Sequence, residues 1–208
     1  MEKMKTNLIN LFIIAFLLLG TSAQAQNANE ARKVLDKTAS IVGRKGGAKA
    51  TFTLSSTKYG NASGTIAIKG NKFNARTSQA IIWYNGKTQW SYMKATEEVN
   101  ITTPNEAQQV AMNPYKFITI YKTGFNLSMT TKGNNYVVHL TAQNKKRSVQ
   151  EMYITINKKT YVPSQVKMKQ GSVWTTLDIA NFQAKDQSDN IFIFNAKEFP
   201  NSEVIDLR

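Results

Sequence analysis

The sequence predicts an α+β fold built on one large antiparallel sheet with a single apolar face. Apolar and polar residues alternate through most of the chain after residue 50, and turn residues interrupt the alternation at fairly even intervals. One helical pattern precedes the strands and another interrupts them. These helices are available to cover the apolar face.

The first 25 residues have the pattern of a cleaved signal peptide. Lys3 and Lys5 precede a short apolar run at 8–20, and the small residues of AQA at 23–25 suit a signal peptidase. The run is too short for a comfortable transmembrane helix. We therefore expect residues 26–208 to form one domain in the periplasm. The chain has no cysteine, so core packing must stabilise it without disulfide bonds.

Two segments have helical patterns. Apolar residues recur at helical spacing through residues 29–42, and Gly43 is a suitable C-terminal stop. In residues 103–121, Thr103 precedes Pro104 and Glu106, which predicts a capping box with Thr103 as the N-cap. We expect a helical insert there, in the middle of the sheet.

The other segments have the alternation of half-buried strands. We expect strands within residues 51–54, 64–70, 98–102, 124–129, 136–142, 152–157, 164–170 and 175–182.

The stretch WYNGKTQWSY, residues 83–92, concentrates aromatic side chains around a predicted turn. Asn-Gly is a strong signal for a two-residue hairpin loop, which would pair Trp83 with Thr88 and Ile81 with Trp90. Ile81, Trp83, Trp90 and Tyr92 would then form an apolar plate on one side of the hairpin. The plate is either ordinary core or the lining of a cavity.

A large one-sided sheet has more concave apolar surface than two or three short helices can cover. A sheet that curls without closing leaves a cavity between itself and those helices. Such a cavity would bind acyl chains or other apolar ligands.

Residues that support catalysis are scarce. Alternation places the one histidine, His139, on the solvent face, opposite Val138 and Leu140. The sequence has no phosphate-binding glycine pattern, metal-ligand spacing or nucleophile elbow, so we expect no enzyme activity, no cofactor and no metal.

The formal net charge is +14, and the basic residues are scattered in ones and twos. In an exported protein this favours a solvated basic surface over a nucleic-acid site. Attraction to anionic lipid headgroups or to an acidic partner is the alternative.

Residues 63–101 resemble the periplasmic outer-membrane lipoprotein carriers of the LolA type. The stretch has a glycine-led strand, a Phe-containing strand and an Asn-Gly-Lys-Thr turn followed by Trp and another aromatic residue. NPYKFI at 113–118 is similar to the family's Pro-led lid segment. Residues 191–206 are similar to its C-terminal Phe-x-Phe strand and hydrophobic tail. The resemblance extends over essentially all of residues 26–208.

The resemblance implies an incomplete, half-open antiparallel β-barrel with helices covering the concave apolar face. It also implies a carrier without catalytic activity, which we expect to be a monomer. Such a carrier accepts an acylated lipoprotein from an inner-membrane lipoprotein-releasing transporter, shields its acyl chains in a hydrophobic cavity, and hands it to an outer-membrane acceptor.

Twelve residues are expected to bind lipid in the cavity and lid. Six match the family's apolar sheet and lid positions, namely Phe73, Trp90, Tyr92, Tyr115, Phe117 and Ile118, and alternation adds Phe52, Leu54, Ile66, Ile68, Ile81 and Trp83. The sequence departs from the family in one place. Gly70-Asn71 replaces an Arg-Pro pair whose Arg helps to latch the lid, so no latch residue is carried over.

Two other functions are compatible with the same residues. One is a binding module of this fold that senses lipids or lipoproteins without transferring them. The other is a carrier for a glycolipid or another amphiphile.

Overall fold

The structure is a computed structural model that describes residues 25–58, 60–105, 108–109 and 113–208. Apart from residue 25, the predicted signal peptide lies outside the described residues. The strands are β1 (Ala48–Ser56), β2 (Gly60–Lys69), β3 (Lys72–Thr77), β4 (Ala80–Tyr84), β5 (Gln89–Met93), β6 (Glu98–Thr102), β7 (Phe125–Lys132), β8 (Asn135–Ala142), β9 (Glu151–Asn157), β10 (Pro163–Gln170), β11 (Val173–Gln183) and β12 (Glu203–Asp206). A helix spans residues 25–42, and the short helices are α3 (Pro114–Phe117), η1 (Ile120–Lys122), η2 (Asp189–Phe192) and η3 (Ala196–Glu198).

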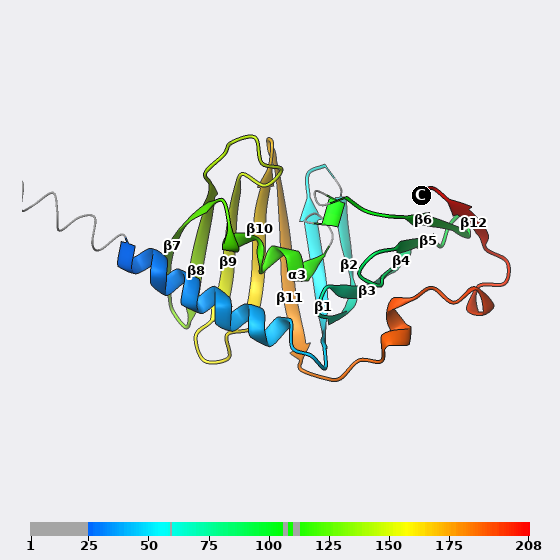
Figure 1. The fold of residues 1–208 in the computed structure, drawn as a ribbon, viewed down its shortest axis with the longest axis horizontal. Coiled ribbons are helices and arrows are strands. Elements are labelled where there is room, and N and C mark those ends of the chain that lie inside the picture. The colour runs from blue at the N-terminus through cyan, green and yellow to red at the C-terminus, as the bar shows by residue number, and fades with distance from the viewer. Residues whose placement is uncertain (1–24, 59, 106–107, 110–112) are drawn as a thin grey trace, which may run out of the picture.

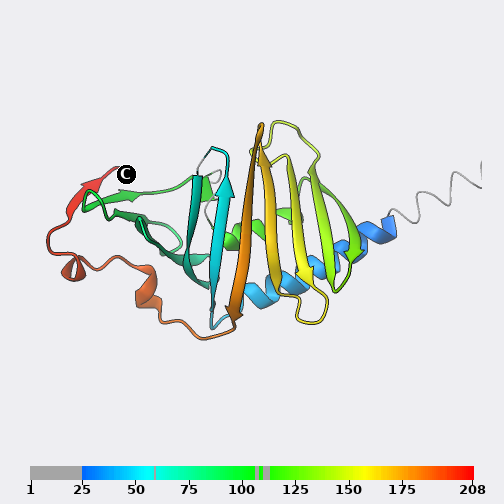
Figure 2. The same cartoon turned by 180° about the vertical axis from the view of Figure 1, so that it is seen from behind.

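The twelve strands of the described residues form one sheet in the order β12-β6-β5-β4-β3-β2-β1-β11-β10-β9-β8-β7 (Figure 1). Neighbouring strands are antiparallel except β12, which runs parallel to β6. The sheet is open, and the helix at 25–42 and α3 lie on one face, behind the strands in Figure 2. The predicted α+β fold, an open antiparallel sheet with helices on its concave face, is confirmed.

The strands form where alternation predicts them, and the chain connects them in two meanders. The first runs from β1 to β6 and the second from β7 to β11, so the helical insert carries the chain from β6, next to the edge strand β12, to the opposite edge strand β7. The meanders join where β1 pairs with β11, with Leu54 opposite Leu177. This pairing of distant segments is not visible in local sequence.

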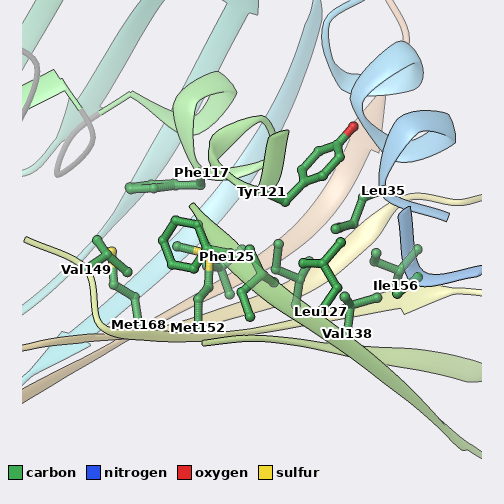
Figure 3. Close-up of a cluster of buried hydrophobic side chains, with 14 of the residues drawn as sticks. Leu35, Phe117, Tyr121, Phe125, Leu127, Val138, Val149, Met152, Ile156 and Met168 are labelled. Atoms are coloured by element: carbon green, nitrogen blue, oxygen red, sulfur yellow. The ribbon is translucent and has the colours of Figure 1, made fainter. Parts of the chain in front are cut away.

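The helix at 25–42 packs on the second meander. Its stripe of Ala31, Val34 and Leu35 is buried against a cluster of apolar side chains from β7 to β10 (Figure 3). Phe117 of α3 and Tyr121 of η1 complete the same cluster from the helical side. This half of the molecule is therefore solidly packed.

The edge strand β7 is covered by a side chain of the first helix. The carboxamide of Asn27 donates to the backbone oxygen of Met129 at 2.9 Å and accepts from its backbone nitrogen at 2.7 Å. Asn27 thus takes the place of a neighbouring strand at this position. This matters because exposed strand edges are sites of aggregation.

The capping box of the helical insert is displaced by two residues from its predicted position. Asn105 is the cap, because its side chain accepts from the Gln108 backbone nitrogen at 3.0 Å and the Gln108 side chain accepts from the Asn105 backbone nitrogen at 2.8 Å. Glu106, the predicted partner of Thr103, lies outside the described residues. Asn and Gln form the same reciprocal pair as Ser/Thr with Glu.

The β4–β5 hairpin has a different register from the predicted one. Trp83 pairs with Trp90 rather than with Thr88, and Ile81 pairs with Tyr92. The side chain of Asn85 accepts from the backbone nitrogens of Lys87 and Thr88, so the turn is centred one residue later than Asn-Gly. The shift of two residues along the partner strand leaves each side chain on its predicted face.

The C-terminal segment does not form the Phe-x-Phe strand that the family resemblance implies. Residues 189–192 form the short helix η2, and its last residue, Phe192, is fully buried. The segment follows the end of the sheet, where Asp189 lies 2.9 Å from the Lys72 ammonium and 3.3 Å from that of Lys69. These two lysines hold the pKa of Asp189 below its usual value. The one strand in this segment is β12.

Asn27→Ala should lower the free energy of unfolding by about 1–2 kcal/mol, because two backbone groups of β7 lose their partners. Denaturant titration measures the change. Asn126→Ala on the same strand is the matched control, since the Asn126 side chain is exposed and bonds only to Gln143 in the described contacts. Equal effects in the two variants would contradict the assigned role of Asn27.

Candidate functional site

A cavity of about 270 Å³ lies between the sheet and its helical cover. Its walls come from the inner faces of β1 to β4 and of β10 and β11, and Val42 and Phe117 contribute from the helical side. The lining is predominantly apolar and includes Ala50, Phe52, Leu54, Ala62, Ile66, Ile68, Phe73, Ala75, Ala80, Ile82, Pro163, Val166, Met168, Leu177, Ile179 and Phe182.

The cavity exists because small side chains line the sheet where the helical cover is incomplete. Ala50, Ala62, Ala75 and Ala80 take inward-facing positions on the first meander, where larger residues would fill the space. The helix at 25–42 buries most of its stripe on the second meander, and Val42, in its last turn, is the helix residue that reaches the cavity.

The polar groups of the lining are few. Besides Lys49, three threonines contribute, and the Thr175 hydroxyl donates to the Ser56 hydroxyl at 3.1 Å. Burying a polar ligand group without partners costs free energy, so the cavity favours hydrocarbon. An apolar cavity of about 150 Å³ is large enough for benzene. The present cavity can therefore hold a longer apolar group.

Of the twelve predicted lipid-binding residues, six line the cavity, namely Phe52, Leu54, Ile66, Ile68, Phe73 and Phe117. Ile118 and Tyr115 lie beside it. Ile118 is buried in a second apolar cluster with Phe73 and Tyr84, and Tyr115 packs against this cluster.

The other four predicted residues, which form the apolar plate of the β4–β5 hairpin, face away from the cavity. The Trp83 ring lies 5.5 Å from the rings of both Phe194 and Phe199, and the Tyr92 ring lies 4.7 Å from that of Phe199. Ile81 and Trp90 share this outer face by register. The C-terminal segment covers the plate, and so the expected position of these residues in the cavity is corrected.

The side of the hairpin with the smaller residues faces the cavity instead. Ala80 and Ile82 of β4 line it, together with Ala75 of β3. A sequence signal was present, because a void requires small residues at inward positions, whereas large aromatic rings fill space. The contributions of β10 and β11 could not be found locally, because they depend on the pairing of β1 with β11.

A buried asparagine holds the α3 segment over the sheet. Asn113 is fully buried, and its carboxamide donates to the backbone oxygen of Asn71 at 2.8 Å. Its side-chain oxygen accepts from the Tyr115 backbone nitrogen at 3.0 Å, which caps α3. The Gly70-Asn71 turn lacks the latch arginine that the family resemblance implies there. Its backbone instead accepts a hydrogen bond from Asn113 of the α3 segment.

A partly buried polar contact joins η1 to the helix at 25–42. The Tyr121 hydroxyl of η1 donates to the Asp36 carboxylate of the first helix, and Arg32 lies 5.8 Å from the Tyr121 ring. Burial raises the pKa of Tyr121, and the hydrogen bond to Asp36 raises it further. Tyr121 therefore stays protonated and keeps η1 joined to the helix.

The outer face of the second meander carries the histidine. His139 stacks on Tyr153 with ring centroids 4.2 Å apart, and the Glu151 carboxylate lies 3.0 Å from its Nε2 atom. The Tyr153 hydroxyl and His139 lower the pKa of Glu151. This group lies across the sheet from the buried Val138 and Leu140, as alternation predicts.

The described part of the chain has neither a cluster of metal ligands nor a helix suited to span a bilayer. No group of three or more His, Cys, Asp or Glu side chains there could hold a metal ion. Within the same residues, none of the helices combines the length and hydrophobicity needed to cross a bilayer.

The architecture is an open curled sheet with an apolar cavity beneath a short helical cover. The family model described as outer membrane lipoprotein carrier protein LolA matches residues 21–172. The chain belongs to this family. A search of curated protein sequences finds no match.

Several solved structures are similar. An uncharacterized conserved protein from Thermus thermophilus has a TM-score of 0.57 and 12% identity, with 85% of this chain and 99% of that chain covered. A LolA superfamily protein from Nitrosomonas europaea has a TM-score of 0.43 and 11% identity, with 79% and 97% covered. LprF from Mycobacterium bovis has a TM-score of 0.45 and 8% identity, with 77% and 96% covered. At 12% identity, the similarity to the Thermus thermophilus protein supports the fold alone.

Asn113→Ala should loosen the α3 segment, because it removes the bond to Asn71 and the cap on Tyr115. We expect amide hydrogen exchange in residues 115–119 to accelerate about tenfold or more, which corresponds to the loss of roughly 1–2 kcal/mol of local stability. The amides of β8 serve as the internal control, since they lie in the solidly packed half. Unchanged exchange in 115–119 would show that Asn113 does not hold the segment.

Proposed function

We propose that this protein is a periplasmic carrier that shields the acyl chains of lipoproteins in its cavity and delivers them from the inner to the outer membrane. The observation that carries the proposal is the cavity of about 270 Å³ with its largely apolar lining. The family, whose description names a lipoprotein carrier, supports the class of cargo. The role requires binding and release but no bond-making chemistry, so we assign no enzymatic activity.

The cavity can supply enough free energy to hold a lipid tail in water. Burial of one methylene group contributes about 0.8 kcal/mol, so about a dozen methylenes contribute on the order of 10 kcal/mol. The headgroup or peptide part of the cargo would remain outside, where water satisfies its polar groups.

Release requires that side chains of the protein compete with the acyl chain for the space in the cavity. Phe117 supports this requirement, because it both lines the cavity and belongs to the buried cluster under the first helix. A chain larger than the existing cavity must displace α3 and its bond to Asn71. The cost of that displacement subtracts from the affinity, so the protein can act as a carrier that gives its cargo up.

The partners follow from this role. Cargo would arrive from an inner-membrane lipoprotein-releasing transporter and leave to an outer-membrane acceptor, with the carrier as a monomer. Of the predicted lipid-binding residues, we assign direct contact with the acyl chain to the six that line the cavity. Ile118 and Tyr115 would support the lid.

Ala62→Phe should weaken binding of a fluorescent long-chain fatty acid at least about tenfold, because the new ring occupies cavity volume that the probe needs. The matched control is Ala180→Phe, which places the same ring on the exposed outer face of β11. Fluorescence titration measures both affinities, and circular dichroism checks the fold. Equal probe affinity in the two variants would place the ligand elsewhere and remove the basis of the proposal.

A transfer assay separates a carrier from a sensor of the same fold. We expect the protein to remove a labelled triacylated lipoprotein from inner-membrane vesicles that contain the releasing transporter and to pass it to outer-membrane vesicles. A sensor would bind the labelled lipoprotein and retain it. Ala62→Phe should abolish the transfer, whereas Ala180→Phe should leave it intact.

A further inference from the structure

One end of the sheet carries a cluster of lysines and tyrosines that the cavity does not use. The turn after β7 and the turn after β9 lie side by side at the lower edge of Figure 1, where the Lys158 backbone nitrogen donates to the Asn134 oxygen at 2.9 Å. The first helix passes this edge. We define the lysine–tyrosine rim as Lys37, Lys132, Tyr136, Lys158, Lys159 and Tyr161.

The two tyrosines form the apolar centre of the rim. The Tyr136 and Tyr161 rings have centroids 6.3 Å apart, and both pack against the buried cluster of the second meander while remaining partly exposed. The Lys158 ammonium lies 5.6 Å from the Tyr136 ring, and that of Lys37 lies 5.9 Å from the Tyr161 ring. Each ring thus presents an aromatic body and a polar tip beside a cation.

The turn holds Tyr161 in a conformation that a tyrosine rarely adopts. Its φ is 55°, in the left-handed region that favours glycine. Backbone hydrogen bonds from Tyr161 to Asn157 and from Asn157 to Val162 enclose it. Glycine would be less strained at this position. The presence of tyrosine therefore indicates that its side chain is required there. Here the conformation places the ring beside Tyr136 and Lys37.

The positive charge of the rim is not neutralised locally. Residues 130–137 and 157–163 contain no Asp or Glu. Among the described residues, no carboxylate lies within ion-pair distance of the four rim lysines. Asp36, next to Lys37 in the chain, accepts the Tyr121 hydroxyl instead. The rim therefore presents four cations around two amphipathic rings.

We propose that this rim docks the protein on a bilayer surface that contains anionic phospholipid. Tyrosine prefers the depth of the headgroups, and lysine can keep its ammonium among phosphates while its stem lies on apolar surface. Basic residues close to an anionic leaflet are attracted individually, without a shaped pocket. An acidic protein is the less suitable partner, because protein interfaces are depleted in lysine and favour arginine.

Docking at the rim would bring the cavity close to the membrane. Pro163, the first residue of β10, lines the cavity and follows directly on the turn that carries Lys158, Lys159 and Tyr161. The walls formed by β1 to β4 lie beyond β10 and β11 in the strand order and remain free. The rim is thus a surface separate from the acyl-chain site, yet adjacent to one of its walls.

The test measures sedimentation of the full protein with vesicles of phosphatidylcholine, with and without phosphatidylglycerol. The decisive variant is K132E/K159E, which reverses two exposed rim lysines. Its matched control is K145E/K146E, which reverses two exposed lysines in the turn after β8, at the opposite end of the sheet. Both variants change the net charge equally, so a net-charge effect would appear in both.

We expect the wild type to bind the anionic vesicles at low salt and to be released at high salt, because salt screens exposed charges. Each basic residue near an anionic surface contributes about fivefold to affinity, so K132E/K159E should bind at least about 25-fold more weakly. K145E/K146E should lose less than about fivefold, and both should keep wild-type affinity for the fluorescent fatty acid. Equal losses in the two variants would overturn the proposal. Absence of wild-type binding to anionic vesicles would also overturn it and would favour an acidic protein as partner.

Discussion

The structure depends on a mismatch between the area of one sheet face and the area of its helical cover. Twelve strands spaced about 4.8 Å apart make a sheet roughly 50 Å wide. The helix at 25–42 rises about 1.5 Å per residue and is therefore roughly 27 Å long. The short α3 and η1 add one turn each. About half of the apolar face is thus covered, and the remainder must curl over a void or be exposed to water, which is unfavourable.

The two halves of the molecule solve this problem differently, and the cavity follows from the difference. The half with β7 to β10 is packed solid and supplies stability, with Asn27 protecting its edge and Tyr121 joining its helices. The half with β1 to β4 borders a cavity lined by alanines and a few large rings, and β10 and β11 form its other walls. Phe117 stands at the boundary, and the Asn113 carboxamide holds its segment over the sheet. Phe117, Ile118 and Tyr121 of the cover are buried in apolar clusters, and the hydrogen bonds of Asn113 and Tyr121 add polar contacts to this packing.

The sequence predicted the strands well, because period-two alternation survives wherever one face is buried. The faces were harder to assign. The large aromatic residues around Trp83 suggested a lining, yet the C-terminal segment covers them with Phe194 and Phe199. The cavity lies on the opposite side of the hairpin, where Ala80 is small. Local pattern identifies residues that share a face, but it does not identify the segment that covers that face.

The sequence alone determined the class of the sheet, the first helix, the family resemblance and the scarcity of catalytic groups. Each of these depends only on local residue spacing or on composition. The tertiary structure decided which face is hollow, how β1 and β11 join the two meanders, and which side chains hold the α3 segment over the sheet. Asn113 and Asn71 are 42 positions apart in the chain. Contacts at such separations depend on how the elements pack, and no short window of sequence encodes them.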